Sequence, residues 1–335
     1  TFPSVLVNAN MGIAVGMASN ICSFNLGEIC NTTVELIKDP DADIMETLKA
    51  PDFIGGGQII YDEALMREIY RTGRGSFKLR AKYNYDKSSN CIDIYEIPAT
   101  TTSEAIIDKI IDLAKAGKVK EISDIRDETD KKGLKITIDL KRGTDPDKLM
   151  KKLFKSTPLE DSFGCNFNVL IAGTPRVLGV RELLIAFRTQ CVNRRVYFDL
   201  SKAKDKLHLL EGLQKILLDI DKAIKIIRST DEEQEVVPNL MIGFGIDKIQ
   251  AEYVAEIKLR HLNREYILKR TADIEQLRKD IEDMEDILSS KSRVKKIIIA
   301  ELKEVAEKYD KPRRTEIIFA DVEEDDEEIE EIPDY

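Results

Sequence analysis

The sequence lacks tryptophan, has only two histidines and contains no pair of cysteines at the spacing of a metal or redox motif. Both histidines, His208 and His261, lie within helical patterns, without a cysteine or aspartate at the spacing of a known ligand set. The P-loop, the nucleophile elbow of serine hydrolases and the HExxH metalloprotease motif are also absent. The sequence therefore offers no candidate catalytic residue and no candidate metal ligand.

Long apolar runs are missing as well. No segment reaches the about 18 residues that a membrane helix needs, and none has the pattern of a signal peptide. The five cysteines are scattered along the chain: Cys22, Cys30, Cys91, Cys165 and Cys191. These absences predict a reduced, cytoplasmic location without a membrane partner. The chain begins in an apolar run, residues 2–7, without an initiator methionine, so we expect it to be part of a longer protein.

The net charge of −10 arises from acidic residues at the C-terminal end of the chain. Residues 321–335 hold ten acidic side chains and no basic one, so residues 1–320 sum to about zero. A low pI therefore does not exclude basic patches on the body. Charged residues make up 34% of the chain and aromatic residues 6%, a balance that favours long solvated helices over an all-β sandwich.

Residues 1–185 mix short strand patterns with modest helices, which predicts an α+β region with a mixed sheet. The strand candidates are rich in β-branched or aromatic residues and end at turn residues; they are 57–61, 75–85, 91–97, 135–140 and 168–172. The helix candidates are 26–38, 62–71 and 103–116. A run of threonines precedes the last of these helices and can cap its start.

From about residue 180, long helical periodicity predominates. A first helix is predicted over 199–229, and Pro238, Gly243 and Gly245 then interrupt the pattern. A second helix has an apolar residue at every seventh position, as in a coiled coil: Ile267, Ile274, Ile281 and Leu288. We predict an antiparallel coiled-coil arm with a small helical knob at its tip. A helical hairpin packed back on its own domain stays open as an alternative.

The predicted domains are an α+β domain, a first coiled-coil helix region, the knob, a returning coiled-coil helix and an acidic linker, over residues 1–185, 186–235, 236–264, 265–310 and 311–335. At about 1.5 Å per residue, a 40-residue helix projects roughly 60 Å, so the knob would act at a distance from the body. We predict that it forms a dimer. The candidate interface residues are the apolar side chains Ile242, Phe244, Ile249, Tyr253, Ile257 and Leu262.

The first distinctive segment runs from Asn8 to Ala18 and combines glycines with small apolar residues. Its glycines permit close approach of the backbone to a partner, and a short helix there would present amide donors to a phosphate. An exposed Ile13 could wedge between base steps of a duplex, since the bend that this causes is repaid by further contacts. The segment could equally be a buried contact between small residues.

The second distinctive segment, residues 70–82, holds five basic residues and no acidic one. Side chains alternate along a strand, so Lys78, Arg80 and Lys82 share one face while Phe77, Leu79 and Ala81 share the other. One face would then be core and the other a positive stripe that can follow phosphates, although a basic strand face often serves only solubility. The candidate DNA-binding residues of both segments are Asn8, Ile13, Arg71, Arg74, Lys78 and Arg80.

Five segments, in this order, are similar to the A subunits of DNA gyrase and topoisomerase IV, the bacterial type IIA DNA topoisomerases. They are LVNANMGIAVGMASNI, YRTGRGSFKLRA, EISDIRDETDKKGLKITIDLKRG, HLLEGLQKILLDIDKAIKIIR and KPRRTEI, and together they span nearly the whole chain. The resemblance implies that the α+β region is the tower domain and that the helices form the coiled-coil arm of that family.

The resemblance further implies a homodimer that binds double-stranded gate DNA and that bends it by intercalating Ile13. Arg71, Arg74, Lys78 and Arg80 would contact or steer the DNA backbone, and the knob would be the exit gate. The family's catalytic arginine and tyrosine lie N-terminal to the LVN motif, and none of this chain's tyrosines matches, so the chain alone is expected to be inactive. No cofactor is expected here, because Mg²⁺ and ATP belong to the partner B subunit of an A2B2 assembly.

Three departures from the family pattern bear on these expectations. Ala9 replaces a usual glycine, residues 99–103 lack a usual lysine, and the segment RHLNREYILK near the knob differs from the family's usual sequence. The absence of the family's C-terminal β-propeller leaves gyrase and topoisomerase IV unseparated. A non-catalytic coiled-coil dimer that serves as a scaffold in chromosome maintenance is the alternative function.

Overall fold

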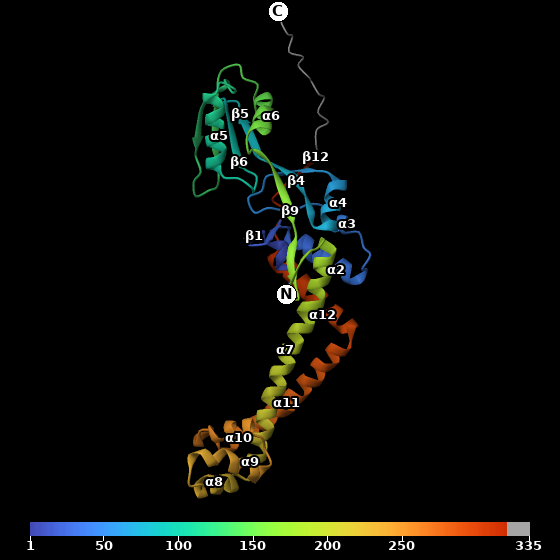
Figure 1. Ribbon diagram of the computed structural model, residues 1–335, viewed down its shortest axis with the longest axis vertical. Helices are drawn as coiled ribbons and strands as arrows, with labels where there is room; N and C mark the ends of the chain where they lie inside the picture. Colours follow the sequence, from blue (N-terminus) through green and yellow to red (C-terminus); the bar gives the residue numbers. More distant parts are fainter. Residues whose placement is uncertain (320–335) are drawn as a thin grey trace, which may run out of the picture. The chain divides into compact units, whose positions relative to one another are not determined.

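A computed structural model describes residues 1–319, apart from the side chains of residues 189–193 and 195 (Figure 1). The chain folds as two compact units. The sheet unit comprises Thr1–Phe187 and the chain from Ile299 onward, and the helical unit comprises Arg188–Ile298. Strands occur in the sheet unit and helices in both, so the predicted α+β class with a mixed sheet is confirmed. The domain boundaries proposed from the sequence stay predictions.

The larger sheet of the sheet unit has six strands in the order β1-β2-β9-β4-β3-β12. Their bounds are Asn10–Ala14, Met17–Ile21, Glu160–Asn166, Arg74–Arg80, Gln58–Tyr61 and Glu316–Phe319. All neighbours pair antiparallel except β12, which runs parallel to β3. One face of this sheet is buried, and its central contact is a stacked pair, Phe77 and Phe163, with ring centroids 5.4 Å apart.

Five helices contribute to this core, namely α1 (Ser4–Val7), α2 (Leu26–Lys38), α3 (Ile44–Thr47), α4 (Glu63–Thr72) and the start of α7 (Val180–Leu217). The predicted helices 26–38 and 62–71 are confirmed, and their ends follow local chemistry. Asn25 and Asp62 each accept a backbone hydrogen bond at a helix start. Gly73 ends α4 at φ 71°, and a Cβ there would lie 2.2 Å from the carbonyl oxygen of Leu178, so only glycine fits.

The second sheet of the sheet unit has four strands in the order β5-β6-β8-β7, with bounds Lys82–Asp86, Cys91–Glu96, Ile136–Leu140 and Ile122–Asp127. Two helices, α5 (Ser103–Lys115) and α6 (Pro146–Ser156), pack on its apolar face around Ile92, Ile94 and Ile106. The predicted single strand 75–85 is wrong. Ala81 is fully buried between β4 and β5 and donates to the carbonyl of Leu159, so the chain changes sheets at that residue.

The predicted acidic linker 311–335 does not begin as a linker. Arg313 forms an ion pair with Glu28 at 2.7 Å and donates to the carbonyls of Ala50 and Pro51. The buried Thr315 accepts a hydrogen bond from the backbone of Phe53, and β12 follows it. These contacts anchor the segment to the first sheet up to Phe319, while the acidic residues 321–335 lie outside the described residues.

The remaining strands form a hairpin, β10 (Asn168–Ile171) and β11 (Thr174–Val177). Its sequence prediction, a strand over 168–172, is confirmed for β10. The patterns missed β1, β2, β7, β9, β11 and β12, because these strands are short or carry mixed polar residues on both faces.

The helical unit contains most of α7 (Val180–Leu217), all of α11 (Arg264–Ser289) and, between them, α8 (Ile220–Ser229), η1 (Glu233–Glu235), α9 (Val236–Phe244), α10 (Lys248–Ala255) and η2 (Leu259–His261). It ends in the first residues of α12 (Lys291–Tyr309). The predicted helix 199–229 is wrong as a single helix, because α7 ends at Leu217 and Asp219 caps the start of α8.

Helices α7 and α11 pack antiparallel through one apolar cluster, which includes Leu210, Leu213, Ile274 and Ile281. Two ion pairs show that the two helices run in opposite directions. Lys204 pairs with Glu285 at 2.6 Å, and Glu211 pairs with Arg278 at 2.9 Å, so residue numbers rise along one helix as they fall along the other. The predicted heptad positions Ile274 and Ile281 are buried in this contact.

A small bundle of α8, α9 and α10 surrounds the end of α7 through a second apolar cluster, centred on Ile216, Leu240 and Ala251. Helix α10 approaches α7 closely, since a Cβ built on Gly212 would lie 2.7 Å from the Cβ of Gln250. Asp247 caps α10 in a capping box with Gln250 and also contacts His208 of α7. This bundle contains most of the residues predicted to form the knob.

Candidate nucleic-acid interface

Strands β1 and β2 form a tight hairpin with Val15 and Gly16 at its turn. The register pairs Ala14 with Met17, and Gly16 has φ 81°. A positive φ at the second turn residue favours glycine. The expected short helix over this segment is therefore wrong: the alternation of small and apolar residues forms strands, and a two-residue turn closes them.

The hairpin exposes its apolar side chains. Ile13 is 88% exposed and Met11 is 80% exposed. An ideal Cβ on Gly12 or Gly16 would meet no heavy atom within 4 Å, so these glycines make no tight packing contact. Among the described residues, this hairpin therefore makes no buried contact between small residues, and Ile13 projects from the sheet.

The predicted alternation along β4 is confirmed. Phe77 and Leu79 are each 2% exposed and lie in the core. Lys78 and Arg80 alternate with them, so they lie on the opposite face of the sheet, and Arg74 shares that face by the same period of two. We call Arg74, Lys78 and Arg80 the β4 stripe. Lys82 comes after the change of sheets and pairs with Glu316 at 3.3 Å.

Register places Ile13 and the β4 stripe on one face of the sheet. Paired residues of neighbouring strands point to the same side. Ile13 pairs with Ala18, which shares its side with Asn20 two residues on. Asn20 pairs with Asn166, and Asn166 pairs with Arg74. At about 4.8 Å per strand, three strand steps separate β1 from β4 by roughly 14 Å.

Asparagine amides fasten the hairpin to β9. Asn20 donates to the carbonyl of Gly164 at 2.6 Å, and Asn166 donates to the carbonyl of Ala18 at 2.8 Å. Asn168 donates to the same carbonyl at 3.2 Å. The predicted DNA-binding residue Asn8 ends α1, and its carbonyl accepts a hydrogen bond from Asn10. These bonds hold the base of the hairpin while its tip stays exposed.

Two buried thiols lie beneath the hairpin base, Cys22 after β2 and Cys165 in β9. Burial raises the pKa of the Cys22 thiol well above its ordinary value, and its contact with Cys165 raises it further. The Cys22 thiol therefore packs as a neutral side chain at neutral pH. Of the five cysteines, Cys191 lies among the side chains that the structure does not describe.

Acidic neighbours reduce the positive charge that the sequence predicts. Glu160 of β9 accepts from Lys78 at 3.0 Å and from Arg80 at 2.8 Å. Arg71 lies at the end of α4 and pairs with Glu68 at 2.7 Å. Arg74 has no ion pair among the residues that the structure describes. The sequence could not indicate Glu160, because it comes from a strand about 80 residues later in the chain.

Neither a metal centre nor a membrane segment is found in the described part of the chain. Within residues 1–319, no group of three or more histidine, cysteine, aspartate or glutamate side chains is placed to hold a metal ion. No helix in the same residues combines the length and the apolar character that crossing a membrane requires.

The candidate dimer residues separate into exposed and packed groups. Ile242 is 83% exposed and Ile249 is 62% exposed, both on the small bundle. Phe244 is partly buried, with the ammonium of Lys222 4.9 Å from its ring centroid. Tyr253 and Ile257 pack against the cluster that joins α7 and α11, and Leu262 is partly buried. The patterns missed Leu259, which is 81% exposed, because it lies in a short 3₁₀ turn.

The sequence model of the family described as the A subunit of DNA gyrase/topoisomerase IV matches residues 1–303. The chain belongs to this family. This membership agrees with the resemblance of the hairpin and β4 segments, which carry the shared face described above.

Several relatives are similar over almost the whole chain. The DNA gyrase A subunit of Borreliella burgdorferi is 38% identical over 328 residues, 95% of this chain and 40% of the relative. That of Clostridium acetobutylicum is 38% identical over 325 residues, 94% of this chain and 39% of the relative. That of Synechocystis is 36% identical over 332 residues, 95% and 38% respectively. The chain thus spans about two fifths of the length of these curated relatives.

Proposed function

We propose that this chain is the part of a type II DNA topoisomerase A subunit that binds and bends the gate segment of duplex DNA. The supporting observation is the shared face of the first sheet. It brings the exposed Ile13 and the β4 stripe to one side, away from the core. An apolar wedge beside cations is the arrangement that a protein needs to kink a duplex and hold its backbone.

In this proposal each group has a separate task. Ile13 inserts between two base pairs, and the cost of unstacking, about a few kcal/mol, is offset by contacts that the bend permits. Arg74, Lys78 and Arg80 bind phosphates and supply affinity that depends on salt. Asn8 and Arg71 lie at the base of the hairpin and at the end of α4, as further backbone contacts.

We further propose that α7 and α11 form an antiparallel coiled-coil arm and that the small bundle is the exit-gate dimerisation knob. The antiparallel packing of the two helices and the exposed Ile242 and Ile249 support this. Exposed apolar side chains on a small bundle are costly unless a partner covers them. A second copy of the chain is the partner in this proposal, through the surface that also contains Phe244, Tyr253, Ile257 and Leu262.

The complete enzyme would be an A2B2 assembly with the B subunit, passing one duplex through a break in another in the bacterial cytoplasm and so changing supercoiling or linkage. ATP and Mg²⁺ would bind the B subunit, and this chain would hold no cofactor of its own. The relatives support this assignment, because they are named as A subunits of DNA gyrase. Gyrase and topoisomerase IV function stay unseparated for this chain.

The experiment measures affinity and bending of a duplex by the chain at low salt. Ile13→Ala should reduce bending, measured as energy transfer between dyes at the duplex ends. Ile54→Ala is the matched control, since Ile54 is also an exposed isoleucine, 78% exposed, in the turn before β3. Arg74→Ala with Arg80→Ala should weaken binding and flatten its salt dependence.

Unchanged affinity and bending in both variants would contradict the proposal. Dimerisation without any binding of duplex DNA would favour the alternative function, a coiled-coil scaffold of chromosome maintenance.

A further inference from the structure

One face of helix α6 is lined by lysines. Lys148, Lys151, Lys152 and Lys155 follow the spacing i, i+3, i+4 and i+7, which places them on one side of a helix. All four are exposed. The opposite side is apolar and buried, with Leu149, Met150 and Leu153 in the core of the four-stranded sheet. We call the four lysines the α6 lysine face.

Acidic neighbours compensate this face only in part. Glu121 lies 3.5 Å from Lys152, whereas Lys148 and Lys151 have no ion pair within the described residues 1–319. The two acids at the start of the helix also oppose the lysines, because their hydrogen-bond donors are neutral and leave their negative charges in place. Asp145 caps the first turn, and Asp147 accepts from the hydroxyl of Tyr83 at 3.2 Å. The four lysines therefore exceed these three acids by one positive charge.

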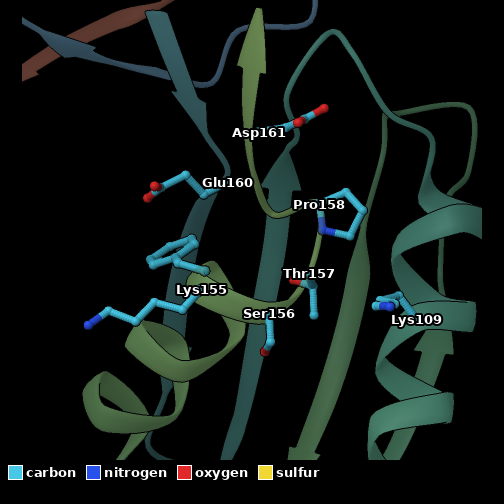
Figure 2. A pocket seen from close by; sticks show the side chains of 8 residues that line it. Lys109, Lys155, Ser156, Thr157, Pro158, Glu160 and Asp161 are labelled. Carbon is cyan, nitrogen blue, oxygen red and sulfur yellow. The ribbon is translucent and has the colours of Figure 1, made fainter.

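The α6 lysine face is continuous with the β4 stripe. The guanidinium of Arg80 lies 4.7 Å from the ring centroid of Phe154, one residue before Lys155 on α6. A shallow hollow of about 300 Å³ adjoins this contact, and its lining includes Lys109, Lys155 and Glu160. Figure 2 shows Lys109 and Lys155 on either side of the loop that carries Thr157 and Pro158. Asp161 also lines this hollow, so the two sets of cations adjoin around acidic side chains.

We infer that the α6 lysine face is a second contact for duplex DNA, which continues the path that begins at Ile13 and the β4 stripe. This inference rests on the proposed function of that stripe. From Lys148 to Lys155 the helix rises about 10 Å at 1.5 Å per residue. A duplex carries one phosphate charge per about 1.7 Å, so this length faces about six charges. Lysines bind such charges without reading base sequence.

The composition of this surface favours DNA over other partners. Among the described residues, every exposed large apolar side chain lies either at or before Tyr95 or at or after Leu170. A membrane-binding helix needs apolar anchors beside its lysines. The core of a protein interface is depleted in lysine and enriched in aromatic residues. A helix face that is rich in lysine and lacks exposed apolar side chains instead complements a phosphate backbone.

The test replaces all four lysines of α6 with glutamine in the chain. Lys131, Lys132, Lys225 and Lys269 are also exposed and have no ion pair among the described residues, so their replacement with glutamine removes the same charge elsewhere. Fluorescence anisotropy measures the affinity for a series of duplexes of about 10 to 40 base pairs, which are roughly 34 to 136 Å long. Circular dichroism and thermal unfolding of each variant check the fold.

The α6 variant should bind the shortest duplex as the unsubstituted chain does and the longest one roughly tenfold or more weakly. The slope of log affinity against log salt should fall by up to about 3.6 on the long duplex, at about 0.9 per lost phosphate contact. The control variant should differ little at any length.

Equal binding of the long duplex by the α6 variant would overturn the inference and leave the proposed function intact. Equal weakening at every length, with an unchanged fold, would also overturn it, because the lysines would then belong to the first contact. If the unsubstituted chain bound no duplex of any length, the proposed function itself would fail.

Discussion

Glu160 is the residue that most limits the charge of the β4 stripe. Its carboxylate contacts both Lys78 and Arg80, and its side chain is only 13% exposed. Partly buried charge-assisted bonds of this kind fix both cations in place. The same carboxylate would repel a phosphate that approached them, so the pairing orders the cations and lowers their attraction for DNA.

Glu160→Gln should therefore strengthen binding of duplex DNA by the chain several-fold. The amide can still accept from one cation but no longer cancels charge, and a steeper salt dependence should accompany the gain. Titration of a labelled duplex measures both. Asp139→Asn, which removes one acid from the second sheet, is the control and should change affinity little. Weaker binding by Glu160→Gln in a folded variant would show that positioning of the cations matters more than their charge.

Patterns of single residues predicted part of the candidate DNA-binding site. The alternation from Phe77 to Arg80 was predicted correctly because the period of a strand is a local property. The position of Asn166 and Glu160 beside this strand was not predictable, since β9 pairs with β4 across about 80 residues of sequence. The expected helix at Ile13 failed because a two-residue turn at Gly16 decides between a helix and a hairpin.

At the scale of elements, the helices follow their caps closely, and α10 is the clearest case. Asp247 accepts from the backbone of Gln250 at 2.9 Å, and the side chain of Gln250 returns a bond to the backbone of Asp247. The Gln250 amide also donates to the carbonyl of His208 at 2.7 Å. One capping box thus both begins α10 and joins it to α7.

The cap of α10 gives the helical unit a dependence on pH. The backbone bond from Gln250, followed by the contact with His208, holds the pKa of Asp247 below its ordinary value of 3.8. A lowered folded pKa contributes stability above the unfolded pKa, and this is lost as pH falls through the folded value. Asp247→Asn should lower the melting temperature at pH 7, and the difference should shrink below about pH 4.

Thermal unfolding followed by circular dichroism measures this difference. Asp221→Asn, in the first turn of α8, is the comparison at a helix start. A constant difference between Asp247→Asn and the unsubstituted chain from pH 7 to pH 3 would contradict the assignment to this carboxylate.

The contact between α7 and α10 depends on the absence of a side chain at Gly212. A Cβ there would lie 2.7 Å from the Cβ of Gln250, which is closer than two non-bonded carbon atoms approach each other. Gly212→Ala should destabilise the chain by about 1 to 3 kcal/mol, although alanine favours a helix, because α10 must shift. Gly55→Ala meets nothing within 4 Å and should change the free energy of unfolding little. Urea unfolding compares the two, and equal stabilities would contradict the packing constraint.

At the scale of the whole molecule, the sequence predicted the division into an α+β part and a helical part, because the period of apolar residues changes near residue 180. It did not predict that the chain returns to the first sheet as β12. Arg313, Thr315 and the parallel pairing with β3 depend on partners that lie about 260 residues earlier. A local pattern of four residues before an acidic run gives no indication of such a pairing.

Dimerisation is a property of the whole molecule in the proposed function. Ile242→Asp with Ile249→Asp should weaken self-association, because charges would replace exposed apolar side chains within the proposed contact. Leu218→Asp is the matched control, since Leu218 is 83% exposed in the same unit. Sedimentation velocity over a range of concentrations measures the change, and identical behaviour of both variants would place the dimer contact elsewhere.

The late arrival of β12 also bears on how the chain is made. Gln58 bonds to Glu316, a partner 258 residues further along. At about 5 to 20 residues per second, a ribosome needs roughly 13 to 52 s to reach that partner. During this interval β3 has nothing beside its outer edge, and an unpaired edge is a template for strands of other nascent chains. During synthesis this edge therefore stays open to such pairing until β12 emerges.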